Sequence, residues 1–192
     1  MTSKSSQPFS RRVRRAGSTE NRHRNSRRVL CRIAVRRERR AYHRLSGLTG
    51  IPRLLSVVGA HALLLQHIEG VPVGEAHLQN PKEFVRRFEQ LLALMHARGV
   101  SHGELRLAHM LVDRAGQLWL VDFATATVTD ADRPSFIFRL QQRLDRYGWL
   151  LIKERLLSGA LTGSEREEQR RSRLLANVFR RRFAKHWRGS SM

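Results

Sequence analysis

Two carboxylates, Glu104 and Asp122, flank a stretch with the pattern of two short strands joined by a turn. Residues 110–112 and 118–121 are apolar, and Asp-Arg-Ala-Gly at 113–116 is a turn sequence that ends in glycine. Such a hairpin would hold Glu104 at its beginning and Asp122 at its end, on the same side. Two carboxylates on one rigid edge suit a site that binds a metal ion together with phosphate groups.

The order of the surrounding motifs resembles the atypical branch of the protein-kinase-like superfamily, with its RIO-type kinases and the lipopolysaccharide core kinases that act on Kdo or heptose. Residues 102–109 read His-Gly-Glu-Leu-Arg-Leu-Ala-His, similar to the catalytic loop, and Val-Asp-Phe-Ala at 121–124 is similar to the metal-binding segment. Residues 37–54 and 68–72 resemble the upstream signature and the hinge of that branch. The resemblance covers about residues 28–157.

The resemblance implies ATP and Mg²⁺ as cofactors and a sugar or protein hydroxyl as the phosphate acceptor. It assigns Asp122 and Glu104 to catalysis, as metal ligand and base. Glu38, Arg106 and Asp122 would bind the cofactor, and Asp122 and His109 match the two metal positions. The Glu side chain is longer than the family's Asp and shifts the carboxylate by about 1.5 Å. Such a shift can cost on the order of a hundredfold in rate, so Glu104 is either a weakened base or a residue that binds only the loop backbone.

Two positions depart further from the family pattern. His109 replaces a metal-binding Asn, and because Mg²⁺ prefers oxygen ligands we favour loss of this metal site over an imidazole ligand. Glu38 occupies the place of a Glu that pairs with a strand lysine, but no such lysine and no glycine-rich phosphate loop precede it. We therefore expect Glu38 to pair with Arg36 or Arg40.

The charge of the chain is extreme and uneven. Lys and Arg number 37 against 16 Asp and Glu, which gives a formal net charge of +21. Residues 1–44 contain 15 basic and 2 acidic residues, residues 165–188 contain 9 and 3, and the middle is nearly neutral. Basic ends indicate a polyanionic partner, namely nucleic acid, an acidic membrane surface or a phosphorylated glycolipid, or else a solvated tail.

Three functions follow from these patterns. The first is an ATP-dependent phosphotransferase of the lipopolysaccharide-kinase-like branch, and the second is a pseudokinase that serves as a binding or regulatory module. The third is a basic nucleic-acid-binding protein, although the aromatic residues Phe179, Phe183 and Trp187 are spaced like one face of a helix rather than a base-stacking platform.

Composition also bears on location. Cys31 is the single cysteine, so no intramolecular disulfide can form, and a reducing compartment is favoured. No apolar run is long enough to cross a bilayer, and the N-terminus lacks the apolar stretch of a secretory signal. We expect a cytoplasmic protein, or one bound peripherally at the inner face of a membrane.

The patterns together predict an α+β chain with the protein-kinase-like fold, in which a reduced N-terminal lobe precedes a mostly helical C-terminal lobe. We expect a basic disordered tail over residues 1–27 and a kinase-like domain over 28–192, divided into an N-lobe (28–68) and a C-lobe (69–192) with a basic C-terminal helix. Periodicity predicts helices near 31–46, 82–98, 139–157 and 165–187, strands at 54–58 and 62–67, and a loop at 125–138.

Overall fold

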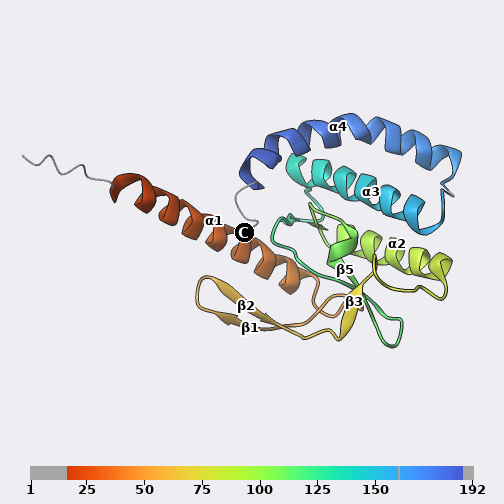
Figure 1. Ribbon diagram of the computed structural model, residues 1–192, viewed down its shortest axis with the longest axis horizontal. Helices are drawn as coiled ribbons and strands as arrows, with labels where there is room; N and C mark the ends of the chain where they lie inside the picture. Colours follow the sequence, from red (N-terminus) through yellow and green to blue (C-terminus); the bar gives the residue numbers. More distant parts are fainter. Residues whose placement is uncertain (1–16, 160, 188–192) are drawn as a thin grey trace, which may run out of the picture.

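A computed structural model of the chain describes the backbone of residues 17–159 and 161–187 and the side chains of residues 31–159 and 161–177. The fold of these residues is α+β, as predicted, with four α-helices and three small antiparallel sheets. Helix α1 (Gly17–Arg44) extends from the body of the protein (Figure 1). The helices α2 (Pro81–Ala97), α3 (Phe136–Leu156) and α4 (Gly163–Trp187) form the larger, helical part.

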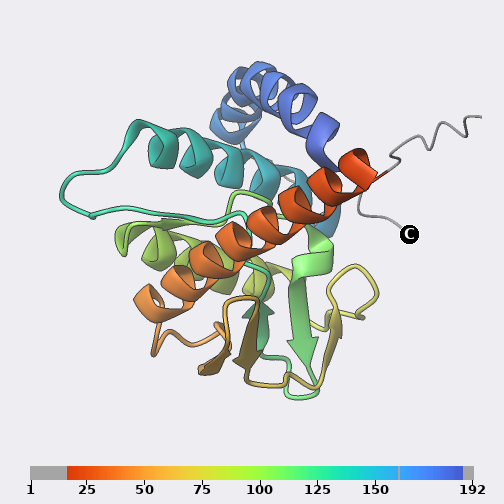
Figure 2. The same ribbon diagram turned by 90° about the vertical axis from the view of Figure 1, so that its left-hand side faces the viewer.

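Helix α1 and a β-hairpin form the smaller part of the protein. Strands β1 (Leu54–Val58) and β2 (Ala62–Leu65) pair antiparallel, in agreement with the predicted strands. Figure 2 shows α1 running diagonally across the molecule, with the hairpin near its C-terminal end. Arg32 of α1 donates a hydrogen bond from Nε to Nε2 of His61 in the hairpin turn at 3.0 Å, and Leu45, the residue after α1, is buried in the core.

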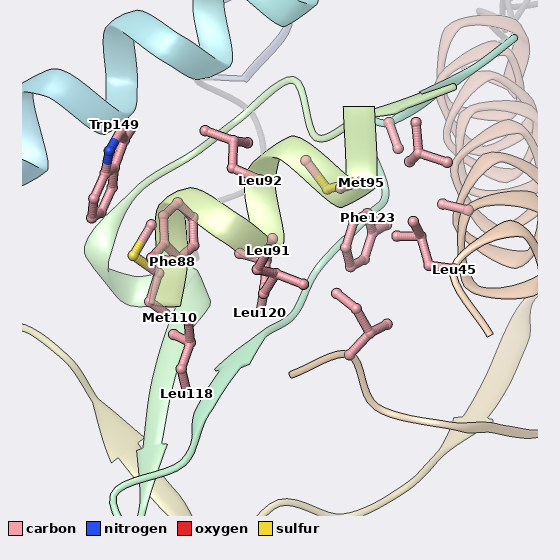
Figure 3. Close-up of a cluster of buried hydrophobic side chains, with 14 of the residues drawn as sticks. Leu45, Phe88, Leu91, Leu92, Met95, Met110, Leu118, Leu120, Phe123 and Trp149 are labelled. Carbon is pink, nitrogen blue, oxygen red and sulfur yellow. The ribbon is translucent and has the colours of Figure 1, made fainter. Parts of the chain in front are cut away.

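Helix α2 lies at the centre of the hydrophobic core. Asn80 is its N-cap residue, since the Asn80 side chain accepts a hydrogen bond from the backbone N–H of Glu83 at 3.0 Å. Figure 3 shows Phe88 of α2 next to Trp149 of α3, and their ring centroids are 4.4 Å apart. The helical spacing predicted from the sequence is confirmed, because the residues at that spacing are all buried, namely Phe84, Phe88, Leu91, Leu92 and Met95.

The predicted central hairpin is present and is part of a three-stranded sheet. Strands β5 (Met110–Asp113) and β6 (Leu118–Leu120) pair antiparallel, and β3 (Gly70–Pro72) pairs with the other edge of β5. Asp113 closes the turn, since its Oδ1 accepts hydrogen bonds from the backbone N–H groups of Ala115 and Gln117 at 3.0 and 2.9 Å. The inward residues of the hairpin anchor it on α2 (Figure 3).

Lys153 of α3 connects helices α2, α3 and α4. Its Nζ lies 3.0 Å from Oε1 of Glu89 on α2 and 2.6 Å from Oε1 of Glu165 on α4. Because Lys153 and Glu165 are largely buried, this pairing compensates for charge that is withdrawn from water. No helix within the described residues is long and apolar enough to span a bilayer.

Helix α1 begins earlier than the sequence indicates. The segment 1–27 lacks apolar periodicity and was expected to be disordered, but α1 starts at Gly17. Arg and Glu are good helix formers, so a helix can form there without an apolar face. Residues 1–16 lie outside the described part of the chain, as do the side chains of Phe179, Phe183 and Trp187.

The expected loop at 125–138 also contains regular structure. Strand β7 (Thr127–Val128) pairs with β4 (Val100–Ser101), which follows α2 directly. Helix α3 then begins at Phe136, because the Ser135 side chain caps it by accepting a hydrogen bond from the backbone N–H of Phe138 at 3.2 Å. Strands of two residues carry too little periodicity to be recognised in a sequence.

Candidate active site

The loop from His102 to Glu104 is fixed from beneath by Asp145 of α3. The Asp145 carboxylate accepts hydrogen bonds at 2.8 Å from the backbone N–H groups of both His102 and Gly103. Its Oδ2 also lies 3.0 Å from Nε2 of His96 on α2. The resemblance implies that a buried Asp on this helix braces the backbone of the catalytic loop, and the structure confirms it, because Asp145 orients the backbone of the loop that presents Glu104.

Gly103 is required by space as well as by backbone conformation. Its φ is +83°, in the left-handed region that favours glycine. A Cβ atom at this position would lie 2.8 Å from the carbonyl oxygen of Thr125 and 2.9 Å from Nε2 of Gln141. The loop therefore packs directly against the segment that follows Asp122.

The four residues predicted around the hairpin lie in one continuous set of contacts. Nη1 of Arg106 is 3.3 Å from Oε1 of Glu104, and Nε of Arg106 donates to Nε2 of His109 at 2.9 Å. The same Nε2 is 3.3 Å from Oδ2 of Asp122. The short helix η1 (Leu107–His109) turns the chain so that His109 faces back toward Asp122. Glu104 and Asp122 thus belong to one site, with Arg106 and His109 between them.

Asp122 has an unusual backbone conformation. It lies just after β6 with φ of +66°, which is uncommon for a residue other than glycine. Its Oδ1 accepts a hydrogen bond from the backbone N–H of Ala124 at 3.3 Å, and the side chain remains 43% exposed. The next residue, Phe123, is buried between Tyr42 and His102, with ring centroids at 5.1 and 5.0 Å. Because the buried Phe123 fixes the backbone, the half-exposed carboxylate of Asp122 is held in a defined position and faces outward.

Glu38 of α1 belongs to the same site, and its predicted pairing with Arg36 or Arg40 is wrong. The described residues contain no ion pair between Glu38 and either arginine. Burial raises the pKa of Glu38, the charge of Asp122 raises it further, and a hydrogen bond from the backbone N–H of Phe123 opposes both. Helix α1 lies so that Glu38 faces the end of β6, whereas the sequence reading considered only its neighbours on the helix.

Tyr42 is a member of the site that the sequence reading missed. It is 2% exposed, and its hydroxyl donates a hydrogen bond to no acceptor among the described residues. Burial and the charges of Glu38 and Asp122 hold the pKa of Tyr42 far above its ordinary value, and the backbone N–H of Asp122, which approaches the hydroxyl oxygen, opposes them only in part. Its spacing of four residues from Glu38 puts both side chains on one helix face, which was the available signal.

His102 braces the site from within. The ring is fully buried, its Nε2 lies 3.0 Å from the carbonyl oxygen of Val121, and its Nδ1 accepts from the backbone N–H of Glu104 at 3.3 Å. Burial lowers the pKa of His102, and the charge of Asp145 opposes this only in part. His102 is therefore a neutral ring that links the loop at residues 102–104 to the residue that follows β6.

The donor set fits a cation whose remaining ligands come from phosphates and water. No group of three or more His, Cys, Asp or Glu side chains within the described residues is arranged to hold a metal ion. Asp122 and His109 offer two donors, and metal ions that act on nucleotides commonly take only one or two protein ligands. The orphaned hydroxyl of Tyr42 beside Asp122 is consistent with a polar group that occupies this space.

Comparison with known proteins identifies the family and the fold of this chain. The model of the RIO domain family matches residues 1–142, which include Glu38, Glu104 and Asp122 but end before Asp145. The chain is similar in fold to the Rio2 kinase of Chaetomium thermophilum, in a crystal structure of its ADP/Mg²⁺-phosphoaspartate complex, with a TM-score of 0.61 and 15% identity. That similarity covers 85% of this chain and 51% of the Rio2 chain. It supports the predicted kinase-like fold.

A curated relative is much longer than this chain. The chain is 32% identical over 150 residues to a protein described as a probable SapB synthase from Streptomyces coelicolor, a similarity that covers 62% of this chain and 16% of the relative. The chain thus spans about half of the matched Rio2 chain and about a sixth of the synthase. On the match over residues 1–142, this chain belongs to the RIO domain family.

Proposed function

We propose that this protein is an ATP-dependent phosphotransferase that transfers phosphate to a sugar or protein hydroxyl, as the resemblance to the RIO and lipopolysaccharide-kinase branch suggests. The observation that carries the proposal is the continuous contact from Glu104 through Arg106 and His109 to Asp122. It supports a site in which a base, a phosphate-binding cation and a metal ligand are adjacent. Phosphoryl transfer needs chiefly this kind of positioning.

Each residue has a defined task in the proposed reaction. Glu104 accepts the proton of the acceptor hydroxyl, and its side chain is held near that position by the loop that Asp145 fixes. In place of the expected loss of the metal position at His109, we propose that Asp122 and His109, whose Oδ2 and Nε2 are 3.3 Å apart, would together hold a metal ion, which would neutralise phosphate charge when bound. Arg106, whose side chain is 50% exposed, turns from Glu104 to contact the transferred phosphate.

A pseudokinase is the second candidate, and two observations favour it. Glu104 is engaged in an ion pair with Arg106, so the base is not free in this state. Lys82 lies on α2, and Lys153 lies on α3, where Glu89 and Glu165 occupy it. Neither lysine therefore takes the place of the strand lysine that pairs with the Glu at the position of Glu38 in the family pattern. A pseudokinase would bind nucleotide or a protein partner without transfer.

Phosphate transfer from radiolabelled ATP to the protein itself or to candidate acceptors distinguishes the two. Replacing the base in Glu104→Gln should reduce the rate at least about 100-fold, and Asp122→Asn should reduce it by a similar factor because a metal ligand is lost. Glu167→Gln, an exposed position on α4, should retain full activity. Nucleotide binding without transfer in the wild-type protein would instead identify a pseudokinase.

The basic ends support a polyanionic partner as a further proposal. The C-terminal end of α4 and the N-terminal half of α1 lie toward the same side of the molecule in both views (Figures 1 and 2), so the two basic segments face the same side. Arg36, Arg37, Arg39 and Arg40 are exposed and form no ion pair with the described residues. We infer binding to nucleic acid or to the inner face of an acidic membrane from the cytoplasm. The test is the affinity of the protein for nucleic acid or for acidic vesicles at increasing salt concentration. We expect this affinity to fall steeply with salt, and an affinity that does not depend on salt contradicts the proposal.

A further inference from the structure

His109 is the unusual donor of the site, and its contacts fix its tautomer. Its Nδ1 lies 3.0 Å from the carbonyl oxygen of Glu104, which can only accept a hydrogen bond, so Nδ1 carries a proton. Its Nε2 lies 2.9 Å from Nε of Arg106, which can only donate, so Nε2 presents a lone pair. The same nitrogen is 3.3 Å from Oδ2 of Asp122. The imidazole nitrogen and the carboxylate oxygen are thus close enough to bind one cation together. In this structure the guanidinium of Arg106 already contacts the nitrogen.

We propose that His109 makes this a site selective for a divalent first-row transition-metal ion, such as Mn²⁺, over Mg²⁺. The inference rests on the proposed function, because nucleotide phosphates would supply further ligands. Mg²⁺ demands oxygen ligands and binds imidazole poorly, whereas imidazole is a common ligand of transition-metal ions. The fixed Nδ1–H tautomer leaves Nε2 ready to bind without loss of a proton.

The buried hydroxyl of Tyr42 is an independent indication that a ligand occupies this place. Tyr42 is 2% exposed and lies beside Glu38 and Asp122, and its O–H donates to no acceptor among the described residues, while the backbone N–H of Asp122 approaches its oxygen. A buried donor that lacks an acceptor carries a desolvation penalty, so such a group normally has a partner. A hydrated cation held at Asp122 would bring a polar partner to this hydroxyl.

Arg106 is a competitor for the metal ion within the same site. Its guanidinium donates to the nitrogen that the metal ion would bind and is also paired with Glu104. The side chain is half exposed, so it can leave without disrupting the core. Metal binding would displace Arg106 from His109. The freed guanidinium could then contact the nucleotide phosphate, so binding of the metal ion would make Arg106 available to the phosphate.

Electron paramagnetic resonance of free Mn²⁺ measures binding directly, without and with ATP, and competition with Mg²⁺ gives the ratio of the two affinities. His109→Asn replaces the nitrogen with an amide oxygen, and we expect the preference for Mn²⁺ over Mg²⁺ to fall at least about tenfold. His77→Asn, at an exposed position before α2, should leave the ratio unchanged. An unchanged ratio in His109→Asn, with ATP binding retained, overturns the inference and leaves the proposed function intact.

A second variant keeps the proposal testable if His109→Asn does not fold. Arg106→Gln removes the competing cation from an exposed side chain, and we expect Mn²⁺ alone to bind several-fold more tightly than to the wild-type protein. If Arg106→Gln binds Mn²⁺ no more tightly than the wild-type protein does, Arg106 does not compete with the metal ion for His109. Failure of the wild-type protein to bind either metal ion in the presence of ATP overturns both the inference and the proposed function.

Discussion

The carboxylate of Asp145 accepts a hydrogen bond at 2.8 Å from the backbone N–H of His102, which lies 43 residues earlier in the chain. The carboxylate is almost completely buried and has two further partners, Gly103 and His96. A buried charge is tolerated only when its hydrogen-bonding capacity is used in this way. One side chain of α3 thus determines the path of the loop that presents Glu104.

Removing this carboxylate should destabilise the protein strongly. Asp145→Ala leaves two buried backbone N–H groups without an acceptor, and we expect the free energy of unfolding to fall by about 3 kcal/mol. Urea denaturation measures this change. Asp132→Ala, in the exposed loop before α3, should change it by less than about 0.5 kcal/mol. Equal effects of the two substitutions would show that Asp145 does not support the loop.

Gly103 and Gly116 separate the effect of backbone conformation from that of close packing. Both have positive φ, +83° and +75°, but an added Cβ meets Thr125 and Gln141 only at Gly103 and nothing within 4 Å at Gly116. We expect Gly116→Ala to cost about 1 kcal/mol in stability and Gly103→Ala about 2 kcal/mol more. Similar losses for both variants, measured by denaturation, would contradict the close approach.

Glu165 should make the free energy of unfolding fall at acidic pH. Burial raises the pKa of Glu165, but hydrogen bonds from Lys153 and Thr162 and the charge of Lys153 outweigh it, so the pKa lies below the ordinary value of 4.5. Arg146 of α3 also faces Glu165, at 3.7 Å. The unfolded chain takes up a proton at higher pH than the folded protein, so this contribution is present above pH 4.5 and is lost as the pH falls.

The variant Glu165→Gln isolates this contribution. We expect it to be less stable than the wild-type protein at about pH 7, and the difference to shrink at about pH 3.5, where the carboxyl group of the unfolded chain is already largely protonated. Urea midpoints at the two pH values measure the difference. A stability difference that is the same at both would mean that the pairing with Lys153 does not perturb Glu165.

The parts of the fold that could be predicted are those that depend on local patterns. Helix α2 and the β5–β6 hairpin have clear periodicity and a turn sequence, and both were predicted within one or two residues. Arg106 and His109 follow Glu104 within a few residues, so their contacts with it are local. The family motif also indicated that Asp122 would join them.

The parts that could not be predicted depend on how distant segments pack. Glu38 and Tyr42 meet Asp122 across about eighty residues, and only the placement of α1 against the end of β6 brings them together. The pairing of Glu38 with a neighbouring arginine is the natural expectation for a solvated helix and fails because that helix face is half buried. The short strands β4 and β7 form because α2 and α3 hold them side by side.

Nucleotide binding tests the central claim most directly. ATP at about a hundred times its Kd should stabilise the wild-type protein by about 2.7 kcal/mol, seen as a rise in Tm, when Mg²⁺ or Mn²⁺ is present. Asp122→Asn should lose this stabilisation, and Glu167→Gln should keep it, because only Asp122 lies in the site. A metal-dependent rise in Tm that disappears in Asp122→Asn is the result we predict. No rise in the wild-type protein at millimolar ATP with either metal ion would contradict the proposed phosphotransferase.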